Sequence, residues 1–355
     1  MKTLLITACG LSSRFEGLRP KWMLTHPNGR LMLTQSISGL NLEAFDRICF
    51  SFLQEHFDEY QCMDGIKKCI QELGVLEKSE IKLFPHRTKD QVQTVYESLD
   101  LFNIEGSFLV KEIDNYFEFD CLDDGNIVCY SDLNDTTSIN PTNKGYVVTD
   151  GKKIKKMVEK KVVSTTFSCG AYQFENANYF KKAYQELRKV NSDNLYLSTV
   201  IDLMISKGQD FYAAKVENYL DWGTKEDWLN YCNEFATIFC DLDGTLLTSS
   251  GEYFKPYWEE AKPIQENVDK LNQLHDSGKA KIIITTARKK KFKTLTIEQL
   301  EKYNIKYHEL IIGLNHCQRI LINDFAPSNP YPSATALNLK RNDNNLSALL
   351  NILHD

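Results

Sequence analysis

Two short apolar runs, each followed at once by a polar turn, constrain the fold of this chain more than any other feature of its sequence. The runs cover residues 3–8 and 236–240. Such a run is typical of the first strand of an α/β domain, because functional groups collect at the carboxyl ends of parallel strands. The chain has 355 residues, which is enough for two domains. We therefore predict two Rossmann-like α/β domains, a larger one at 1–233 and a smaller one at 234–355.

Hydrophobic periodicity predicts further strands and helices in both halves of the chain. The predicted strands cover residues 46–52, 107–110, 145–148, 165–170, 281–285, 309–312 and 319–322. The predicted helices cover residues 57–73, 91–101, 179–189, 198–207, 225–235, 263–276 and 296–303.

The composition excludes several classes of protein. Hydrophobic residues make up 42% of the chain and charged residues 25%, which is typical of a globular protein that is neither disordered nor fibrous. The formal net charge of −6 provides no overall basic surface, so we do not expect nucleic acid as the main partner. No stretch approaches the ~20 apolar residues of a membrane span, so membrane insertion is not expected.

The ten cysteines favour a reducing compartment. They are scattered, form no C-x-x-C pair, and several lie within apolar runs. Buried free thiols fit this pattern better than a disulfide framework does. We therefore expect a cytoplasmic protein.

The turn after the first apolar run has the residue types of a phosphate-binding loop. Gly10, Ser12 and Ser13 are small, so backbone N–H groups can approach an anion, while Arg14 and Lys21 supply positive charge. Such a loop is suited to a triphosphate.

Two acidic residues far apart in the sequence, Asp114 and Asp221, lie at predicted strand ends. Two such carboxylates can jointly hold Mg²⁺ on a triphosphate, because this ion prefers few carboxylates together with phosphate oxygens. Between them lie the pair Glu159-Lys160 and a strand-like segment that contains Gly170.

These segments, in this order, resemble the nucleotidyltransferases that join an NTP to a sugar 1-phosphate and release pyrophosphate. The family pattern is a loop G-x-G-[ST]-R with P-K downstream, a metal-binding Asp midway, E-K before G-x-Y, and Asp before G-T. The resemblance covers residues 1–228 and implies a GT-A-like fold. It departs from the pattern at Cys9 and Ser12, where glycines are usual, and at Glu112, where some relatives have Asp.

The resemblance implies a role for each of these residues. The loop residues 10 and 12–14 would wrap the phosphates, Lys21 would stabilise charge on the transferred phosphoryl group, and the two acids would bind Mg²⁺. The residues implied at the acceptor are Glu159, Lys160 and Gly170. Thr88, in the stretch 88–94, falls where the family contacts the base.

The turn after the second run is the most specific stretch of the chain, Asp241-Leu242-Asp243-Gly244-Thr245. The first carboxylate can attack a phosphoryl group to form an aspartyl-phosphate. The second carboxylate, two residues on, can protonate the leaving group and then activate water.

Residues 236–355 resemble the haloacid-dehalogenase (HAD) phosphatase superfamily, whose first motif is D-x-D-G-T-[LV]. The second motif, a Thr or Ser at a strand end, matches Thr286, with Thr285 as the alternative. The acidic fourth motif matches Asp324, which would bind Mg²⁺ with Asp241 and the main-chain carbonyl of Asp243. The Lys of the third motif is missing, and Arg319 is the nearest basic residue that could neutralise the phosphate.

The gaps between these motifs are too short for a cap domain, because independently stable units rarely fall below ~40 residues. A capless phosphatase of this kind acts on a bulky substrate or takes its lid from a neighbouring domain or a second protomer, so a homo-oligomer is one possibility. The basic run 288–293 reads either as a solvated loop or as a guide for an anionic substrate, led by Arg288.

Together these motifs predict a bifunctional, Mg²⁺-dependent enzyme whose partners are an NTP and a small phosphorylated substrate. Nucleotidyl transfer to a sugar phosphate would serve bacterial capsule or lipopolysaccharide synthesis, and the phosphatase would act in the same pathway. Two alternatives stay open. The acceptor could be a phosphorylated amino alcohol, amino acid or polyol, or the C-terminal domain could be a catalytically silent structural module.

Overall fold

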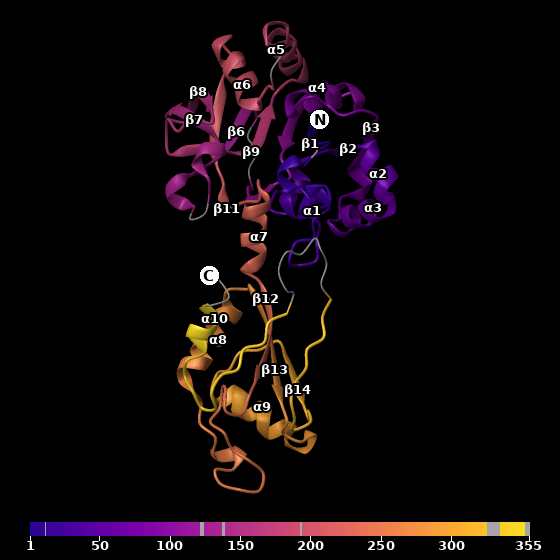
Figure 1. Cartoon of the computed structure of the whole chain (residues 1–355). Helices are drawn as coiled ribbons and strands as arrows, with labels where there is room; N and C mark the ends of the chain where they lie inside the picture. Colours follow the sequence, from indigo (N-terminus) through magenta and orange to yellow (C-terminus); the bar gives the residue numbers. More distant parts are fainter. Residues whose placement is uncertain (11, 121–123, 137–138, 192–193, 325–333, 352–355) are drawn as a thin grey trace. The chain divides into compact units, whose positions relative to one another are not determined.

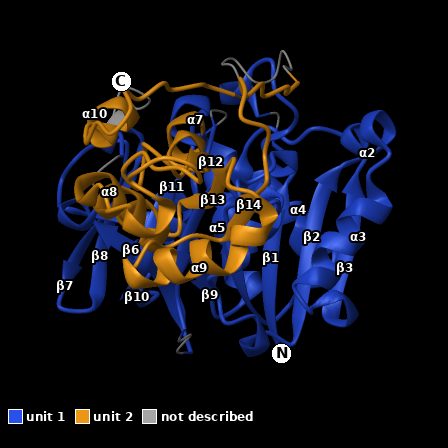
Figure 2. Cartoon of the chain, turned by 90° about the horizontal axis from the view of Figure 1, so that it is seen from below, with its two compact units in different colours: residues 1–228 blue, residues 229–355 orange. Residues whose placement is uncertain are grey.

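The computed structural model divides the chain into two compact units, Met1–Trp228 and Leu229–Asp355 (Figures 1 and 2). The structure describes residues 1–355 except 11, 121–123, 137–138, 192–193, 325–333 and 352–355. We describe each unit by itself and call them unit 1 and unit 2.

Unit 1 is built on a mixed sheet of nine strands in the order β3-β2-β1-β4-β9-β6-β10-β8-β7. The strands β1, β2, β3 and β4 are mutually parallel, whereas β9 runs antiparallel to both β4 and β6. A separate two-stranded ladder pairs β5 with β11. The strand bounds are β1 Lys2–Ala8, β2 Arg47–Leu53, β3 Ser79–Phe84, β4 Ser107–Lys111, β5 Asn115–Glu118, β6 Asn126–Asp132, β7 Gly145–Asp150, β8 Lys153–Glu159, β9 Thr166–Phe174, β10 Phe211–Lys215 and β11 Glu217–Asp221.

Helices cover both faces of this sheet, because alternate side chains of a strand point to opposite faces. In β1, Leu5 packs into one apolar cluster with α4, α5 and α6, while Leu4 and Ile6 pack into another with α1 and α3. Strands buried on both faces are near-continuously apolar, as the first run is. The helices of this part of the chain are α1 Met32–Ile37, α2 Gln54–Tyr60, α3 Met63–Glu72, α4 Gln91–Leu101, α5 Ala177–Val190, α6 Leu197–Ser206 and α7 Lys225–Asn233.

Unit 2 contains a parallel sheet of three strands in the order β12-β13-β14. Its apolar core includes Leu242 and Leu246, which follow β12, together with Val268 and Leu271 of α8 and Leu300 of α9. The element bounds are β12 Ala236–Asp241, β13 Ala280–Thr286, β14 Glu309–Ile312, α8 Gln265–Asp276, α9 Lys293–Lys302 and α10 Leu346–Asn351.

Two predicted elements are wrong. The helix predicted at 57–73 is two helices, α2 and α3, because Gln61 adopts the left-handed conformation with φ 46° and ends α2. The strand predicted at 319–322 is not formed: Ile320, Leu321 and Ile322 are 76%, 60% and 90% exposed. An apolar run becomes a strand only when a neighbouring strand pairs with it, and the described residues place none beside this one.

Two further sequence-level expectations can be compared with the structure. Nine of the ten cysteines lie among the described residues, and all nine are free thiols, but only five of them are buried as predicted and Cys317 is exposed. Cys121 lies outside the described residues. Within the described part of the chain, no helix combines the length and apolar character needed to cross a membrane.

Candidate functional site

A side-chain hydrogen bond closes the loop after β1. Ser12 adopts a left-handed φ of 53°, and its hydroxyl oxygen accepts a hydrogen bond from the Lys21 backbone N–H at 2.9 Å. The short 3₁₀ turn Ser13–Phe15 lies between these residues and is held down by the buried Phe15 ring. A Cβ at Gly10 would meet nothing within 4 Å, so the space above this residue is open to a ligand. The adjoining Leu11 lies outside the described residues.

Lys21 and Arg14, both predicted phosphate ligands, converge on Asp114. The Lys21 ammonium nitrogen lies 2.7 Å from Asp114 Oδ2, and Arg14 Nη2 lies 3.6 Å from the same oxygen. Burial by itself would raise the pKa of Asp114, which is 8% exposed, but Lys21, Arg14 and Lys144 hold that pKa well below its usual value. The Asp114 carboxylate is therefore ionised across the physiological range.

The ladder between β5 and β11 brings Asp221 to the same place. Asp221 pairs with Asn115, and the Trp222 N–H donates to the Asp114 carbonyl oxygen at 2.8 Å. A Cβ at Gly223 would lie 3.2 Å from Asp221 Oδ1 and 3.7 Å from Arg14 Nη1, so the Arg14 guanidinium also borders this carboxylate. The fold thus brings together two acidic residues that lie more than a hundred positions apart in the sequence, as joint binding of one metal ion would require.

Each of the two carboxylates is bound by an ammonium group. Lys21 contacts Asp114, and Lys144 contacts Asp221, with Nζ 2.7 Å from Asp221 Oδ2. Burial raises the pKa of Asp221, and Lys144 opposes that rise. Lys144 is a site residue that the sequence reasoning missed, since it stands in no motif.

The donor set fits Mg²⁺ held jointly with a nucleotide. The ammonium groups of Lys21 and Lys144 show that the fold accommodates positive charge beside the carboxylates of Asp114 and Asp221. The described residues contain no group of three or more His, Cys, Asp or Glu side chains that would enclose a metal by themselves. One or two carboxylates plus phosphate oxygens is the usual arrangement for Mg²⁺ in phosphoryl-transfer sites.

Glu112 and Gly170 are in close contact beside this pair. Gly170 has φ 72°, and a Cβ there would lie 2.5 Å from Glu112 Oε2. Gln91, the first residue of α4, donates from Nε2 to Glu112 Oε1 at 3.0 Å. Burial, with Asp114 as a second cause, raises the pKa of Glu112. Gly170 therefore has a packing requirement as well as its implied place at the acceptor.

The predicted acceptor pair lies at the end of β8. Glu159 Oε2 accepts a hydrogen bond from the Ser198 hydroxyl at 2.7 Å, and Gly145 is its partner in the β7–β8 ladder. Lys160 has φ 54°, and its ammonium donates to the Tyr196 hydroxyl at 2.7 Å. The Thr88 hydroxyl, the implied base contact, bonds the Thr94 hydroxyl near the start of α4.

In unit 2, Asp241 is the last residue of β12, and Asp243 lies in the tight turn that follows. Leu242 N–H donates to the Thr285 carbonyl of β13, and Gly244 N–H donates to the Leu247 carbonyl. Gly244 has φ 91°, so the turn requires a residue without a side chain. The carboxyl end of β12 therefore carries Asp241, and Asp243 follows it in the turn.

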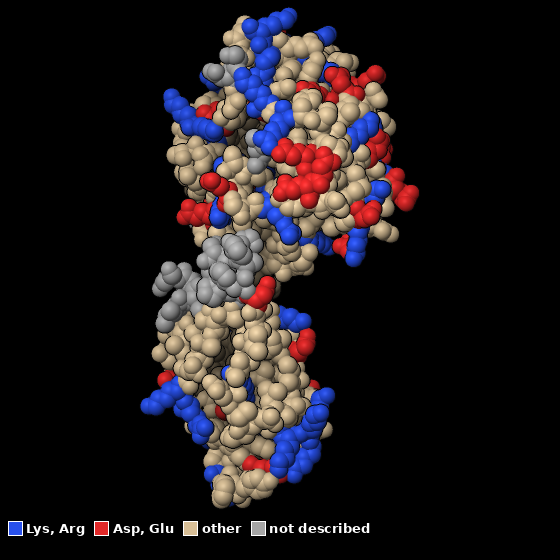
Figure 3. Space-filling view, turned by 45° about the vertical axis from the view of Figure 1, so that its right-hand side comes forward, with Lys and Arg blue, Asp and Glu red and all other residues tan. Residues whose placement is uncertain are grey.

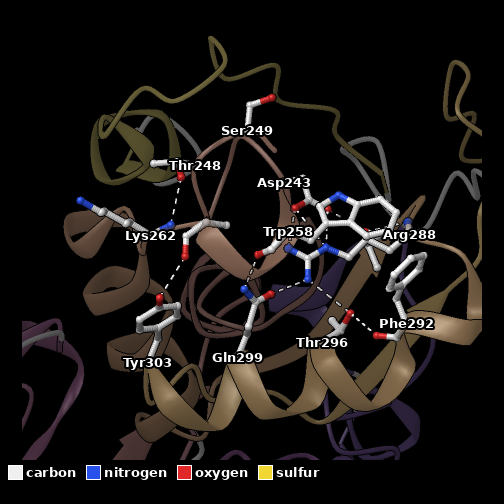
Figure 4. A network of polar contacts seen from close by, with 12 residues as sticks. Asp243, Thr248, Ser249, Trp258, Lys262, Arg288, Phe292, Thr296, Gln299 and Tyr303 are labelled. Carbon is white, nitrogen blue, oxygen red and sulfur yellow. Dashed lines mark hydrogen bonds and ion pairs between the residues drawn. The ribbon is translucent and has the colours of Figure 1, made fainter. Parts of the chain in front are cut away.

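Asp243 is fixed by a buried guanidinium (Figure 4). Arg288, 1% exposed, donates from Nη2 to Asp243 Oδ1 at 2.7 Å and from Nε to Asp243 Oδ2 at 3.0 Å. Its Nη1 donates to Gln299 Oε1 of α9 at 2.6 Å. Arg288 is therefore neither of the alternatives that the sequence left open, a solvated residue or a surface guide for substrate. It is a buried residue that orients Asp243.

The two candidate threonines of the second motif differ in what they contact. The Thr286 hydroxyl donates to Asp243 Oδ2 at 3.0 Å, whereas the Thr285 hydroxyl donates back to the Cys240 carbonyl. The hydroxyl of Thr286 thus contacts a carboxylate of the acidic pair, whereas the hydroxyl of Thr285 contacts a backbone carbonyl.

The remaining residues of this site lie on the exposed segment that follows β14. Arg319 Nη2 lies 2.9 Å from Asp241 Oδ1, and the segment continues to the exposed Asp324. Burial raises the pKa of Asp241, and Arg319 opposes that rise. Arg319 is therefore placed on the predicted nucleophile itself.

Both signs of charge occur on the visible face of each unit (Figure 3). This distribution is consistent with the formal net charge of −6 and with cationic side chains that are gathered locally, as at Arg14, Lys21 and Lys144.

No protein-family model matches the chain, and no curated protein sequence does. Solved structures do match. The nucleoside-diphosphate-sugar pyrophosphorylase from Vibrio cholerae is 19% identical with a TM-score of 0.53, over 65% of this chain and 99% of its own. The inositol-1-phosphate CTP transferase from T. maritima is 16% identical with a TM-score of 0.51, over 64% of this chain and 91% of its own.

A putative glucose-1-phosphate thymidylyltransferase from Bacillus anthracis is also 16% identical with a TM-score of 0.51, over 65% of this chain and 94% of its own. Identities this low establish a shared fold and nothing finer. The N-terminal part of the chain, about two thirds of it, therefore has the fold of the nucleotidyltransferases.

Proposed function

We propose that unit 1 transfers a nucleotidyl group from an NTP to a small phosphorylated acceptor and releases pyrophosphate, with a sugar phosphate as the first candidate acceptor. One observation carries the proposal. The β5–β11 ladder joins Asp114 and Asp221 at the mouth of the loop that supplies Arg14 and Lys21. Carboxylates suited to a metal and cations suited to phosphates thus meet at one place, in a fold shared with solved structures that are named as a nucleoside-diphosphate-sugar pyrophosphorylase and an inositol-1-phosphate CTP transferase.

In the reaction, an oxygen of the acceptor phosphate attacks the α-phosphorus of the NTP in line. A new P–O bond forms, the bond to the bridging oxygen of the β-phosphate breaks, and pyrophosphate leaves, so no covalent enzyme intermediate is needed. Lys21 and Arg14 stabilise the negative charge that builds on the transferred group, and the backbone of the Gly10–Ser13 loop positions the triphosphate. Asp114 and Asp221 would hold Mg²⁺, which neutralises phosphate charge when bound.

A pyrophosphate-release screen tests this proposal. The four NTPs are combined with sugar 1-phosphates, inositol 1-phosphate and phosphorylated amino alcohols, amino acids and polyols, with and without Mg²⁺. We expect Mg²⁺-dependent release with one acceptor class, and that class separates the sugar acceptor from the non-sugar alternative. Asp114→Ala serves as the inactive control. Release that persists in this variant contradicts the assignment of the site.

We also propose that unit 2 is a phosphatase of the HAD type, a member of the same pathway as unit 1. Asp241 would attack the phosphorus of a phosphomonoester, and Asp243 would give its proton to the departing alcohol. Asp243 would then take a proton from the water that hydrolyses the aspartyl-phosphate. The observation in its favour is the turn in which Thr286 and Arg288 both fix Asp243 two residues after Asp241.

One observation favours the rival reading, a catalytically silent module. The Arg319 guanidinium forms an ion pair with Asp241 Oδ1, an oxygen of the predicted nucleophile. Asp324 lies on an exposed segment that forms no strand. Hydrolysis of an aryl phosphate in the presence of Mg²⁺ decides between the two. Turnover that disappears in Asp241→Asn establishes the phosphatase, and turnover that is absent from the wild type, or equal in the variant, favours the silent module.

The two activities together would fit the synthesis of activated building blocks for bacterial surface polysaccharide in the cytoplasm. In one order of steps, unit 2 trims a bisphosphate and leaves the monophosphate that unit 1 couples to the NTP. The acceptor identified by the screen tests this order, because its bisphosphate form should then be a substrate of unit 2.

A further inference from the structure

Lys144 is a nearly buried lysine that no motif accounts for. Its side chain is 13% exposed, and its ammonium lies 2.7 Å from Asp221 Oδ2 and donates to the Tyr219 hydroxyl at 2.9 Å. The same nitrogen lies 5.4 Å from the centre of the Tyr219 ring and 5.9 Å from that of Phe167. The walls around it are therefore aromatic, and the Asp221 carboxylate supplies the anionic contact.

The backbone of Lys144 is part of the predicted acceptor site. Its carbonyl oxygen accepts a hydrogen bond from the Lys160 N–H at 2.9 Å, and the next residue, Gly145, pairs with Glu159. Lys144 therefore links two groups of residues: the carboxylates that would hold the metal and the segment that would hold the acceptor.

The two lysines of this region differ in where their charge lies. The Lys160 ammonium donates to the Tyr196 hydroxyl and lies 4.6 Å from the centre of that ring. The Lys144 ammonium lies on Asp221. A reacting phosphate must come close to the metal-binding carboxylates, because its oxygen attacks the α-phosphorus of the nucleotide whose phosphate oxygens the metal would bind. Lys144 is the lysine of this pair whose charge is already at that place.

A buried ammonium needs an anionic partner, because an unpaired charge in such surroundings is strongly unfavourable. In this structure the anionic partner of Lys144 is the Asp221 carboxylate. A metal ion that binds Asp221 competes with Lys144 for the same carboxylate, so the ammonium then requires another anion close by. A phosphate group in the acceptor site supplies it at little cost in side-chain movement.

We propose that Lys144 binds the phosphate of the acceptor, exchanging Asp221 for the acceptor phosphate as the site fills. This proposal rests on the proposed function of unit 1, and it names the group that recognises the anionic end of the acceptor. The exchange is also a specificity device, because an acceptor without a phosphate leaves the Lys144 ammonium without its second partner.

A metal-free binding cycle tests the exchange without any turnover. Inorganic phosphate is titrated in EDTA by isothermal calorimetry into the wild type, Asp221→Asn, Lys144→Met and the double variant. The Asp221→Asn substitution removes the anionic partner of Lys144. We therefore expect this variant to bind phosphate about tenfold more tightly than the wild type, as one charge-assisted hydrogen bond allows. The double variant should lose that gain. Equal phosphate affinity in Asp221→Asn and the double variant, both folded by circular dichroism, overturns the proposal.

Kinetics with the acceptor found in the screen give the second measurement. Lys144→Met should raise the KM for the acceptor about tenfold or more and leave the KM for the NTP within about twofold, and Lys144→Arg should recover part of the loss. Lys153→Met, in the adjoining hairpin, is the matched control and should change neither constant. Equal changes in both KM values after Lys144→Met contradict the assignment.

The two proposals can fail separately. If no NTP and acceptor pair releases pyrophosphate but the phosphate cycle behaves as expected, the function of unit 1 is wrong and the anion site at Lys144 stands. If pyrophosphate is released and Lys144→Met leaves both the cycle and the acceptor KM unchanged, the function stands and the role of Lys144 is wrong.

Discussion

The fold imposes two requirements on position 170: a backbone with a positive φ, here 72°, and a residue without a side chain, here Gly170. A Cβ there would lie 2.5 Å from Glu112 Oε2 and 2.7 Å from Asn115 Nδ2. We expect Gly170→Ala to destabilise the fold by roughly 2–5 kcal/mol, the sum of backbone strain and overpacking, and to reduce pyrophosphate release by displacing the loop that bears Asp114. Urea unfolding and the release assay measure the two effects.

Gly74→Ala is the matched control, because Gly74 has a similar φ of 75° but nothing within 4 Å of a built Cβ. It should cost only the strain, about 1–2 kcal/mol, and leave activity unchanged. Equal losses of stability in the two variants would show that close packing at Gly170 is unimportant.

Lys111 is a fully buried lysine whose ammonium donates to Asn115 Oδ1 at 2.6 Å and to the carbonyl oxygens of Glu112 and Asn115. Burial lowers the pKa of this lysine from 10.5 to about 8. Between these two values the unfolded chain binds more protons than the folded one, so raising the pH through this window favours the folded state.

We therefore expect the stability of the wild type, relative to Lys111→Met, to rise between pH 8 and pH 10.5 by at most about 3 kcal/mol. Below pH 8 the difference should be constant. Urea unfolding of both proteins over this range measures it. A difference that stays flat up to pH 10.5 would mean that Lys111 titrates as an exposed lysine does.

The sequence alone can group residues that stand in motifs into one candidate site, but it cannot show which residues burial brings to that site. Lys21 and Asp114 were predicted for one site, and the structure places them 2.7 Å apart. Lys144 stands in no motif, and the fold brings its ammonium nitrogen to 2.7 Å from Asp221 Oδ2. Within the basic run, Arg288 alone is buried, while Lys289 and Lys291 pair with the acidic side chain of Glu252 at the surface. Composition cannot distinguish these positions.

At the scale of the elements, a single residue, Gln61, ends α2 and separates it from α3. Gln61 has φ 46°, and its N–H donates to the Phe57 carbonyl oxygen at 2.9 Å. Gln61→Gly should stabilise the fold by about 0.5–1 kcal/mol, because glycine adopts this conformation without strain but loses more entropy on folding.

Gln71→Gly, within α3, is the control and should destabilise the fold by about 1 kcal/mol. Thermal unfolding of both variants decides the sign. Destabilisation by Gln61→Gly would contradict the idea that φ strain limits this helix end.

Elements formed by local periodicity were predictable, and elements formed by distant pairing were not. The helix predicted at 91–101 is α4, Gln91–Leu101, with the same bounds. The strand β8, Lys153–Glu159, has charged residues at three of its first four positions and was missed, because only β7 and β10 make it a strand. The apolar segment 319–322 illustrates the reverse, a strand-like sequence without a partner.

At the scale of the whole molecule, the two sites should act independently. Asp241→Asn should abolish phosphate release from an aryl phosphate and leave pyrophosphate release intact, and Asp114→Ala should do the reverse. Each lost activity should fall by about a hundredfold or more, because a charged group at the reacting centre is removed. Asp276→Asn, on the surface of unit 2, is the control. Loss of both activities in either variant would contradict two independent sites.

The boundary between the two compact units has a practical consequence for dissecting the protein. It falls at Trp228–Leu229, inside α7, Lys225–Asn233. A fragment cut there would divide one short helix between two polypeptides, and neither remnant could stay helical, since isolated helices below about 12 residues are marginal in water. A gene fragment for unit 1 should therefore extend at least to Asn233, so that α7 is kept whole.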